Sequence, residues 1–179
     1  MKKIFAFLLI FVMTFTVTGC SFIGPSLEPR DVLFKVEDYP LQITADNDFH
    51  KSDSINCDLQ ITNNKCFISI MAYKYIDLSE DTTPLDIYDI QNENLFNLRQ
   101  EVAVIEKDST SSFENYTITK AMYSATKEET KNYYATYLID FPKDEIFAWV
   151  LITAVPSYME SNLERLDNIV CSLTTVKQK

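Results

Sequence analysis

The sequence predicts an α+β domain built on an antiparallel sheet of about six strands and flanked by two main helices. Two observations support this prediction. Short runs of alternating apolar and polar residues recur along the chain, whereas helical spacing of apolar residues occurs only near the middle and at the end. The order is therefore strands, one helix, more strands and a terminal helix, which favours an α+β fold.

The first 19 residues have the three parts of a secretory signal peptide. Lys2 and Lys3 give a positive start, an uncharged apolar run covers residues 4–17, and small residues follow. The apolar run is shorter than the roughly 20 residues that a transmembrane helix needs. We therefore expect residues 1–19 to be removed from the mature protein.

The leader ends in Val17-Thr18-Gly19-Cys20, which resembles the lipobox of bacterial lipoproteins. The resemblance implies cleavage between Gly19 and Cys20 and attachment of a diacylglyceryl group to the Cys20 thiol. Two acyl chains would give a durable anchor, because a single chain binds a bilayer only marginally. We expect a lipid-anchored membrane protein that faces the outside of the cytoplasm, with residues 20–31 as a tether and residues 32–179 as a single domain. A secreted protein with a coincidental cysteine is the alternative.

The composition excludes several classes of function. The chain has 26 acidic and 16 basic residues, for a formal net charge of -10, so phosphate backbones and anionic lipids should repel it. A basic protein or peptide suits this charge better than a nucleic acid. Both glycines, Gly19 and Gly24, precede the predicted domain. The glycine-rich loops that bind phosphates or present a nucleophilic serine are therefore missing, and we expect no cofactor.

The first elements of the domain are two short strands, 33–37 and 41–44, joined at Tyr39-Pro40. The clearest strand pair is a hairpin over 57–76, because apolar and polar residues alternate on both sides of Asn63-Asn64. Asparagine tolerates the positive φ of a tight turn. Pairing about this turn gives an inward face formed by Cys57, Leu59, Ile61, Cys66, Ile68 and Ile70.

Three cysteines follow Cys20, an odd number that excludes a fully paired set of disulfides. Cys57 and Cys66 share a face of the hairpin, but the predicted pairing separates them by four residues, or about 13 Å, along it. A disulfide needs α-carbons within about 7 Å. We expect Cys57 and Cys66 to be buried free thiols and Cys171 to be partly exposed.

A helix is predicted over 84–99, because Thr82-Thr83-Pro84 supplies an N-cap and a proline for its first turn. Its expected apolar side holds Leu85, Tyr88, Leu95 and Leu98.

The second half of the chain returns to strands, which we expect at 102–106, 115–123, 132–141 and 145–155, with a polar loop at 107–114. The strand at 145–155 is apolar on both alternating sets of residues, so it should lie at the centre of a sheet covered on both faces. An amphipathic helix closes the chain, because apolar residues recur there at intervals of three and four: Leu163, Leu166, Ile169, Val170 and Leu173.

This order of elements resembles the PsbP-like family, named for an extrinsic photosystem subunit, whose relatives include a Ran-binding import factor. The matching pieces are Tyr-Pro-Leu-Gln-Ile-Thr at 39–44, the acidic loop from Asp46 to Phe49, the hairpin with its Thr-Pro-capped helix, and the closing strands and helix. Family members usually have a proline and a tryptophan where this chain has Asp46 and Phe49. The resemblance covers about 33–176. It implies a sheet covered by helices on both sides and a role in docking or assembly rather than catalysis.

No catalytic or metal site stands out from the sequence. His50 is the only histidine, so a site with several histidine ligands is excluded. Asp46, Asp48 and Asp53 leave a weak calcium site open, but the glycine of an EF-hand loop is missing. The acidic residues around the predicted helix start, such as Asp86, fit capping and the helix dipole. We therefore predict a protein that is not an enzyme.

Aromatic residues are the best candidates for a binding surface, because exposed tyrosine and tryptophan are enriched at interaction hot spots. Tyr73 and Tyr75 lie near the end of a long predicted strand, and Phe67 lies on the outward face of the hairpin. Burial beneath helices is the alternative for these residues. We predict that Tyr73, Tyr75 and Phe67 bind a protein or peptide partner. A small-ligand pocket between sheet and helix is the alternative function.

Overall fold

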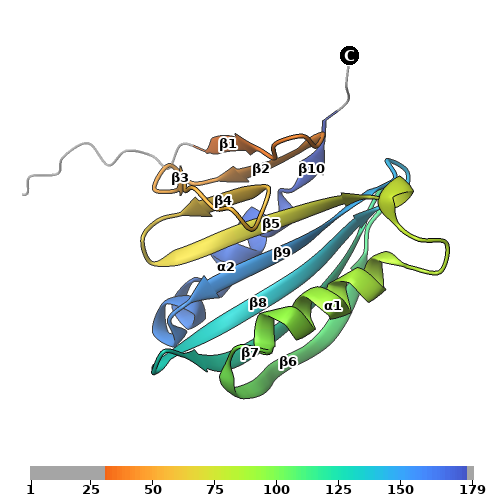
Figure 1. The fold of residues 1–179 in the computed structure, drawn as a ribbon. Helices are drawn as coiled ribbons and strands as arrows, with labels where there is room; N and C mark the ends of the chain where they lie inside the picture. The colour runs from red at the N-terminus through yellow and green to blue at the C-terminus, as the bar shows by residue number, and fades with distance from the viewer. Residues whose placement is uncertain (1–30, 177–179) are drawn as a thin grey trace, which may run out of the picture.

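The computed structural model describes residues 31–176 and confirms the α+β class (Figure 1). A seven-stranded sheet has the order β3-β4-β5-β9-β8-β7-β6, and a three-stranded sheet has the order β1-β2-β10. Every strand pairing is antiparallel. The predicted sheet of about six strands corresponds to the seven-stranded sheet, but the two-residue strands His50–Lys51 and Thr174–Thr175 were not expected, because they are too short to show any alternation. The predicted signal peptide, most of the tether and Cys20 lie outside the described residues.

The small sheet joins the two ends of the domain. β1 (Val32–Lys35) and β2 (Leu41–Ala45) form the hairpin expected around Tyr39-Pro40. β10 (Thr174–Thr175), from the other end of the described chain, pairs with the free side of β2. The sheet is therefore complete only when the last residues of the domain are in place.

The hairpin of β4 (Leu59–Thr62) and β5 (Cys66–Lys74) is present, but its register differs from the predicted one by two residues. Ile61 pairs with Ile68 instead of Cys66. The reason lies in the turn, where Asn64 has a φ of 67°. There the Asn63 side chain accepts hydrogen bonds from the Lys65 and Cys66 N–H groups, which centres the turn one residue later. A shift of two residues preserves the faces, so the predicted apolar residues still point inward.

The three described cysteines are free thiols, as predicted. Cys66 is buried and Cys171 is exposed, also as predicted. Cys57 is only half-buried, because β4 begins at Leu59 and leaves Cys57 in the preceding loop. That preceding segment also contains β3 (His50–Lys51), a short exposed strand at the edge of the larger sheet.

A short 3-10 helix, η1 (Tyr75–Asp77), follows β5 and leads to α1 (Pro84–Phe96). Thr83 caps α1 as predicted: its hydroxyl accepts from the Asp86 N–H, and the Asp86 carboxylate accepts from the Thr83 N–H. The helix ends three residues earlier than expected. The prediction of its apolar side is partly wrong, because Leu85 and Leu98 are exposed. The buried residues of α1 are Tyr88, Asn92 and Leu95.

Strand β6 (Gln100–Ser112) is longer than predicted and includes most of the segment expected to be a loop. It is exposed along its whole length and forms an edge of the larger sheet. Its pairing with β7 (Thr117–Lys127) shows three register shifts. These irregularities disrupt the alternation of residues from which a strand is predicted, so only the part at 102–106 was expected.

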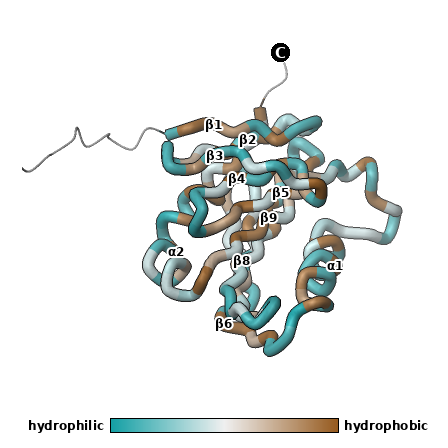
Figure 2. Tube along the Cα trace, turned by 60° about the vertical axis from the view of Figure 1, so that its left-hand side comes forward, coloured by the Kyte–Doolittle hydropathy of each residue, from teal (hydrophilic) through white to brown (hydrophobic). Residues whose placement is uncertain are grey.

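Strand β9 (Ile146–Ala154) lies in the middle of the larger sheet, between β5 and β8 (Thr130–Phe141), as its apolar sequence predicted. α2 (Pro156–Cys171) and the small sheet cover one face, and α1 covers part of the other (Figure 2). The residues of β9 alternate between two cores. Ile146, Ala148, Val150, Ile152 and Ala154 belong to the core on the α2 side. Phe147 and Trp149 belong to the core on the α1 side.

No helix within residues 31–176 has the length and apolar character needed to cross a bilayer.

The turn between β7 and β8 is occupied by residues that suit it poorly. Lys127 pairs with Thr130, so Glu128 and Glu129 form a two-residue turn, and both have positive φ, at 49° and 65°. Such turns favour Asn-Gly, because glycine has no β-carbon to clash in the left-handed region. We predict that Glu129→Gly stabilises the protein by about 1 kcal/mol, which raises the midpoint of thermal unfolding by about 2–4 °C.

Two control variants distinguish the effect of backbone conformation on stability from the effect of the lost negative charge. Glu129→Gln removes the same charge without freeing the backbone, and it should leave the unfolding midpoint close to that of the wild type. Lys131→Gly introduces glycine two residues later, inside β8 where φ is negative, and it should destabilise the protein. Equal midpoints for the two variants at position 129 would contradict the prediction.

The three described thiols should differ sharply in reactivity. Burial raises the pKa of the Cys66 thiol to about 11, and only the thiolate reacts with alkylating agents. We predict that iodoacetamide at pH 8 modifies the exposed Cys171 and the half-buried Cys57 at least about tenfold faster than Cys66, although burial also raises the pKa of the Cys171 thiol. Peptide mass spectrometry measures each rate separately, and unfolding the protein in guanidinium should make the three rates similar. Rapid labelling of Cys66 in the folded protein would be inconsistent with its burial.

Candidate functional site

An open groove of about 1000 Å³ lies on the face of the larger sheet that α1 only partly covers. Its floor is formed by every second residue of two neighbouring strands: Phe67, Ser69 and Met71 from β5, and Trp149, Leu151 and Thr153 from β9. One wall is α1 with the residues after it, and the other is the loop formed by residues 54–58. The groove therefore follows the direction of the strands.

The floor of the groove is held rigidly by hydrogen bonds. The Trp149 indole N–H donates to the Asn92 side-chain oxygen at 3.1 Å, which fixes the ring against α1. The Gln60 amide donates to the Ser69 hydroxyl at 2.9 Å. These bonds pair the indole N–H and the Gln60 amide, and the groove as a whole exposes polar and apolar surface in similar amounts.

Phe67, one of the three predicted binding residues, lies in this groove. Its side chain remains 44% exposed, although it sits on the third strand of a seven-stranded sheet. The helix that would cover it lies farther across the sheet. Phe67 is therefore exposed, and its contact with a partner stays a prediction.

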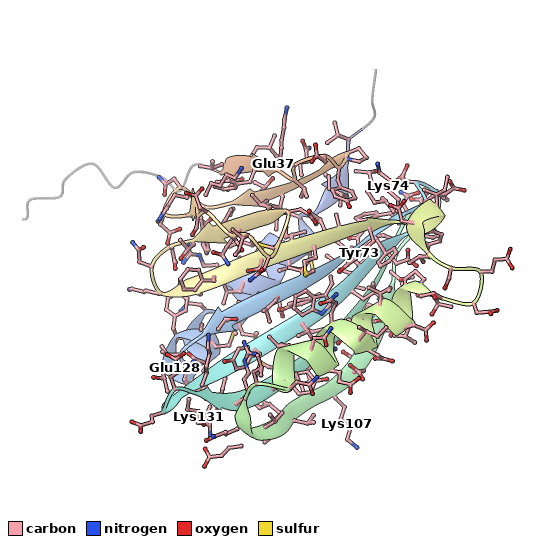
Figure 3. All side chains as sticks on the ribbon, viewed as in Figure 1. Glu37, Tyr73, Lys74, Lys107, Glu128 and Lys131 are labelled. Carbon is pink, nitrogen blue, oxygen red and sulfur yellow. The ribbon has the colours of Figure 1, made fainter. Side chains whose placement is uncertain are left out.

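Tyr73 and Tyr75 are half-buried, so the expectation that they are freely exposed is wrong. The Tyr73 ring stacks on Phe147 with 5.0 Å between centroids, and the Gln91 amide of α1 donates to its hydroxyl at 3.0 Å (Figure 3). Tyr75 lies in η1, and its hydroxyl donates to the Asp140 carboxylate at 2.6 Å. α1 and the adjoining strands therefore use these rings for packing. Phe67 and Tyr73 share one face of β5, about 20 Å apart at strand rise.

The charged residues of the groove lie at its two ends. Arg99 follows α1 and stacks over the Tyr134 ring, with its guanidinium carbon 4.8 Å from the ring centroid. Lys127, at the end of β7, lines the same end. Asp58 lies toward the other end, where its carboxylate accepts a hydrogen bond from the Ala72 N–H at 2.7 Å. These positions come from distant parts of the chain, so no local sequence pattern joined them.

Arg99 is held by its own surroundings as well. Its Nη1 donates to the Leu95 carbonyl, which satisfies a free acceptor at the end of α1. Its Nε is buried and has no hydrogen-bond partner among the described residues. The side chain is thus oriented by stacking and by a single hydrogen bond.

The acidic loop at Asp46 and Asp48 is an ion-pair site rather than an open cation site. Arg165 of α2 donates from Nε to Asp46 at 2.5 Å and from Nη2 to Asp48 at 2.6 Å. Its guanidinium also lies 5.6 Å from the centroid of the Phe49 ring. Asp46 and Phe49 stand where the PsbP-like family usually has proline and tryptophan. Through Arg165 they hold α2 against the end of β2. Within residues 31–176, no three histidine, cysteine or acidic side chains converge as metal ligands would.

Carboxylates with unusual surroundings lie outside the groove. Burial raises the pKa of the Asp140 carboxyl, and the hydrogen bond from Tyr75 partly offsets this shift. Of the described residues that line the groove, Asp58 alone has a carboxylate. The groove therefore offers binding surface rather than a pair of acids in catalytic arrangement.

The fold is similar to three solved structures of low sequence identity. No protein-family model and no curated protein matches the sequence. The solution structure of the cyanobacterial PsbP (CyanoP) of Synechocystis matches with a TM-score of 0.59 and 9% identity, over 85% of this chain and 96% of that one. LpqN of Mycobacterium tuberculosis, described as involved in cell envelope biogenesis, matches with a TM-score of 0.60 and 13% identity, over 84% and 92%.

The Ran-binding protein Mog1p of Saccharomyces cerevisiae matches with a TM-score of 0.55 and 11% identity, over 84% of this chain and 97% of that one. Each likeness spans nearly the whole of the compared domain. At these identities the likenesses show the fold alone. The chain therefore has a PsbP-like fold, as the order of its predicted elements implied.

Proposed function

We propose that this chain is a membrane-anchored extracytoplasmic lipoprotein whose domain binds a protein or peptide in the groove beside α1, without catalysis. The exposed Phe67 ring on the floor of the groove is the observation that carries this proposal. Pockets for small molecules usually enclose most of the ligand. An open groove with an exposed aromatic ring in a polar rim is more typical of a surface that binds a protein.

Two of the structurally similar proteins have roles that support this proposal. Mog1p is a Ran-binding protein, and LpqN is involved in cell envelope biogenesis. Because one fold hosts many functions, the fold alone does not assign a function. The groove of this chain supplies the specific argument.

The position where the chain enters the domain leaves the groove open to a partner. Asp31, the first described residue, lines a hollow between β2 and α2, whereas the groove lies on the α1 face of the sheet. Ten residues lie between Cys20 and Asp31, and the eleven steps of the chain span no more than about 40 Å even when fully extended. An anchor at Cys20 would thus attach to the face opposite the groove.

The lipid anchor gives the first prediction from this proposal. Cys20→Ser should move the protein from the membrane fraction to the soluble fraction, because the acyl chains are its proposed hold on the bilayer. Cys171→Ser removes a thiol that the anchor does not use and should leave the protein in the membrane. Intact mass spectrometry of the membrane-extracted wild type should show a diacylated chain that begins at residue 20. An unmodified thiol at Cys20 would exclude the anchor.

The groove gives the second prediction. A photo-crosslinking phenylalanine analogue at position 67 should capture a partner in intact cells, because that side chain faces into the groove. The same analogue at position 113 is a matched control. Phe113 is exposed to a similar degree, 50% against 44%, but it lies at the other edge of the sheet, stacked on Tyr116. We expect a discrete crosslinked protein from position 67 and no such product from position 113.

Two results would contradict the partner role of the groove. One is a crosslinked product from position 113 and none from position 67. The other is a small metabolite that co-purifies with the wild type and is lost in Phe67→Ala, which would favour a small-ligand-binding protein.

A further inference from the structure

The charge of the groove has the opposite sign to that of the molecule. The chain has a formal net charge of -10, yet the charged residues that line the groove are Arg99, Lys127 and Asp58. The groove thus has an excess of positive charge on an acidic protein. Charge that differs locally from its surroundings is the usual basis of electrostatic selectivity in binding.

Within the described part of the chain, neither positive residue of the groove forms a salt bridge. Among residues 31–176, the lysines and arginines in salt bridges are Lys51, Lys120 and Arg165. Arg99 and Lys127 are not among them, although acidic residues outnumber basic ones. A carboxylate that binds in the groove could therefore contact either cation without an existing salt bridge being broken first.

The ends of the groove can be placed along the strands. Phe67 pairs with Thr153, and Thr153 pairs with Tyr134, the ring beneath Arg99. The Arg99 guanidinium is therefore level with Phe67, and Lys127, which pairs with Thr130, lies farther along in the direction away from Ala72. Asp58 accepts from the Ala72 N–H, so the negative end is level with Ala72. Five residues of β5 separate these levels, or about 17 Å at strand rise.

An extended peptide of five or six residues fits this length, because each residue of an extended chain advances by about 3.3 Å. The apolar surface of Met71 and Leu151 lies between the charged ends, and Phe67 is level with Arg99. A bound segment would place apolar side chains on this floor and charged groups at its ends. Arginine stacked on an aromatic ring also presents its remaining donors in a fixed plane, which suits a carboxylate.

We infer that the occupant of the groove is an extended peptide segment with apolar residues in its centre, a carboxylate beside Arg99 and Lys127, and a basic group beside Asp58. The inference rests on the proposed function and specifies its partner. It also revises the expectation that an acidic protein needs a generally basic partner. The peptide that fits this groove is instead charged at both ends with opposite sign.

A peptide library with blocked termini tests this pattern on the purified full-length protein. The first and last of six positions carry Asp, Asn or Lys in every combination, and the four inner positions carry Val, Leu, Phe or Thr. Retained peptides are identified by mass spectrometry. We expect enrichment of peptides with Asp at one end and Lys at the other over peptides with Asn at both ends.

Charge reversal at the positive end supplies the decisive variant. Lys127→Glu should lower the affinity for the best Asp-containing peptide by on the order of fivefold or more, measured by fluorescence anisotropy at low salt. Its affinity for the same peptide with Asn in place of Asp should change little. Lys107→Glu makes the same change in net charge on β6, outside the groove (Figure 3), and should leave both affinities unchanged. Lys127 is an exposed residue at the end of a strand, so its replacement should leave the fold intact.

The outcomes separate this inference from the proposed function. Equal retention of Asp, Asn and Lys peptides would overturn the charge pattern, as would equal effects of Lys127→Glu and Lys107→Glu. If crosslinking at position 67 still captures a protein in either case, the groove binds a partner of different chemistry. If the library retains no peptide and position 67 captures nothing, both proposals fail.

Discussion

The central strand β9 imposes the main constraint on this fold, because both of its faces are apolar. Such a strand is stable only when each face is covered, and each large side chain that it buries contributes about 1.5–3 kcal/mol. α2 and the small sheet cover the face that presents Val150 and Ile152, and α1 covers the face that presents Phe147 and Trp149. The other elements are arranged around these two layers.

The groove follows from the difference in size between the sheet and the one helix on its α1 face. Seven strands spaced by about 4.8 Å make a sheet about 30 Å wide, whereas a helix is about 10 Å wide. α1 packs over β8 and β9, with Tyr88 against Thr136 and Asn92 against Trp149. The part of the face formed by β5 therefore stays open. Phe67 is exposed for this reason, and not because the strand lies at an edge.

Much of the fold could be predicted from sequence, because its signals are local. The apolar run of β9, the Thr83-Pro84 helix start and the spacing of the α2 residues each lie within a few consecutive positions. The site was harder to predict. Phe67 was found from strand alternation, but the half-burial of Tyr73 depends on where α1 lies, and Arg99, Lys127 and Asp58 meet only through long-range pairing. The length of β6 was hidden by its register shifts. These same shifts, with the charged residues along that exposed edge, disfavour pairing of one molecule with another.

The pairing of distant segments has a consequence for how the chain matures. β2 receives β10 only from the last described residues, and β5 pairs with β9 across more than seventy positions. Contacts of such long sequence separation form late and slowly. The small sheet and the pairing of β5 with β9 are therefore incomplete in a growing chain until its last elements are present. Under the proposed export, this delay would help to keep the chain unfolded until its final segment has crossed the membrane.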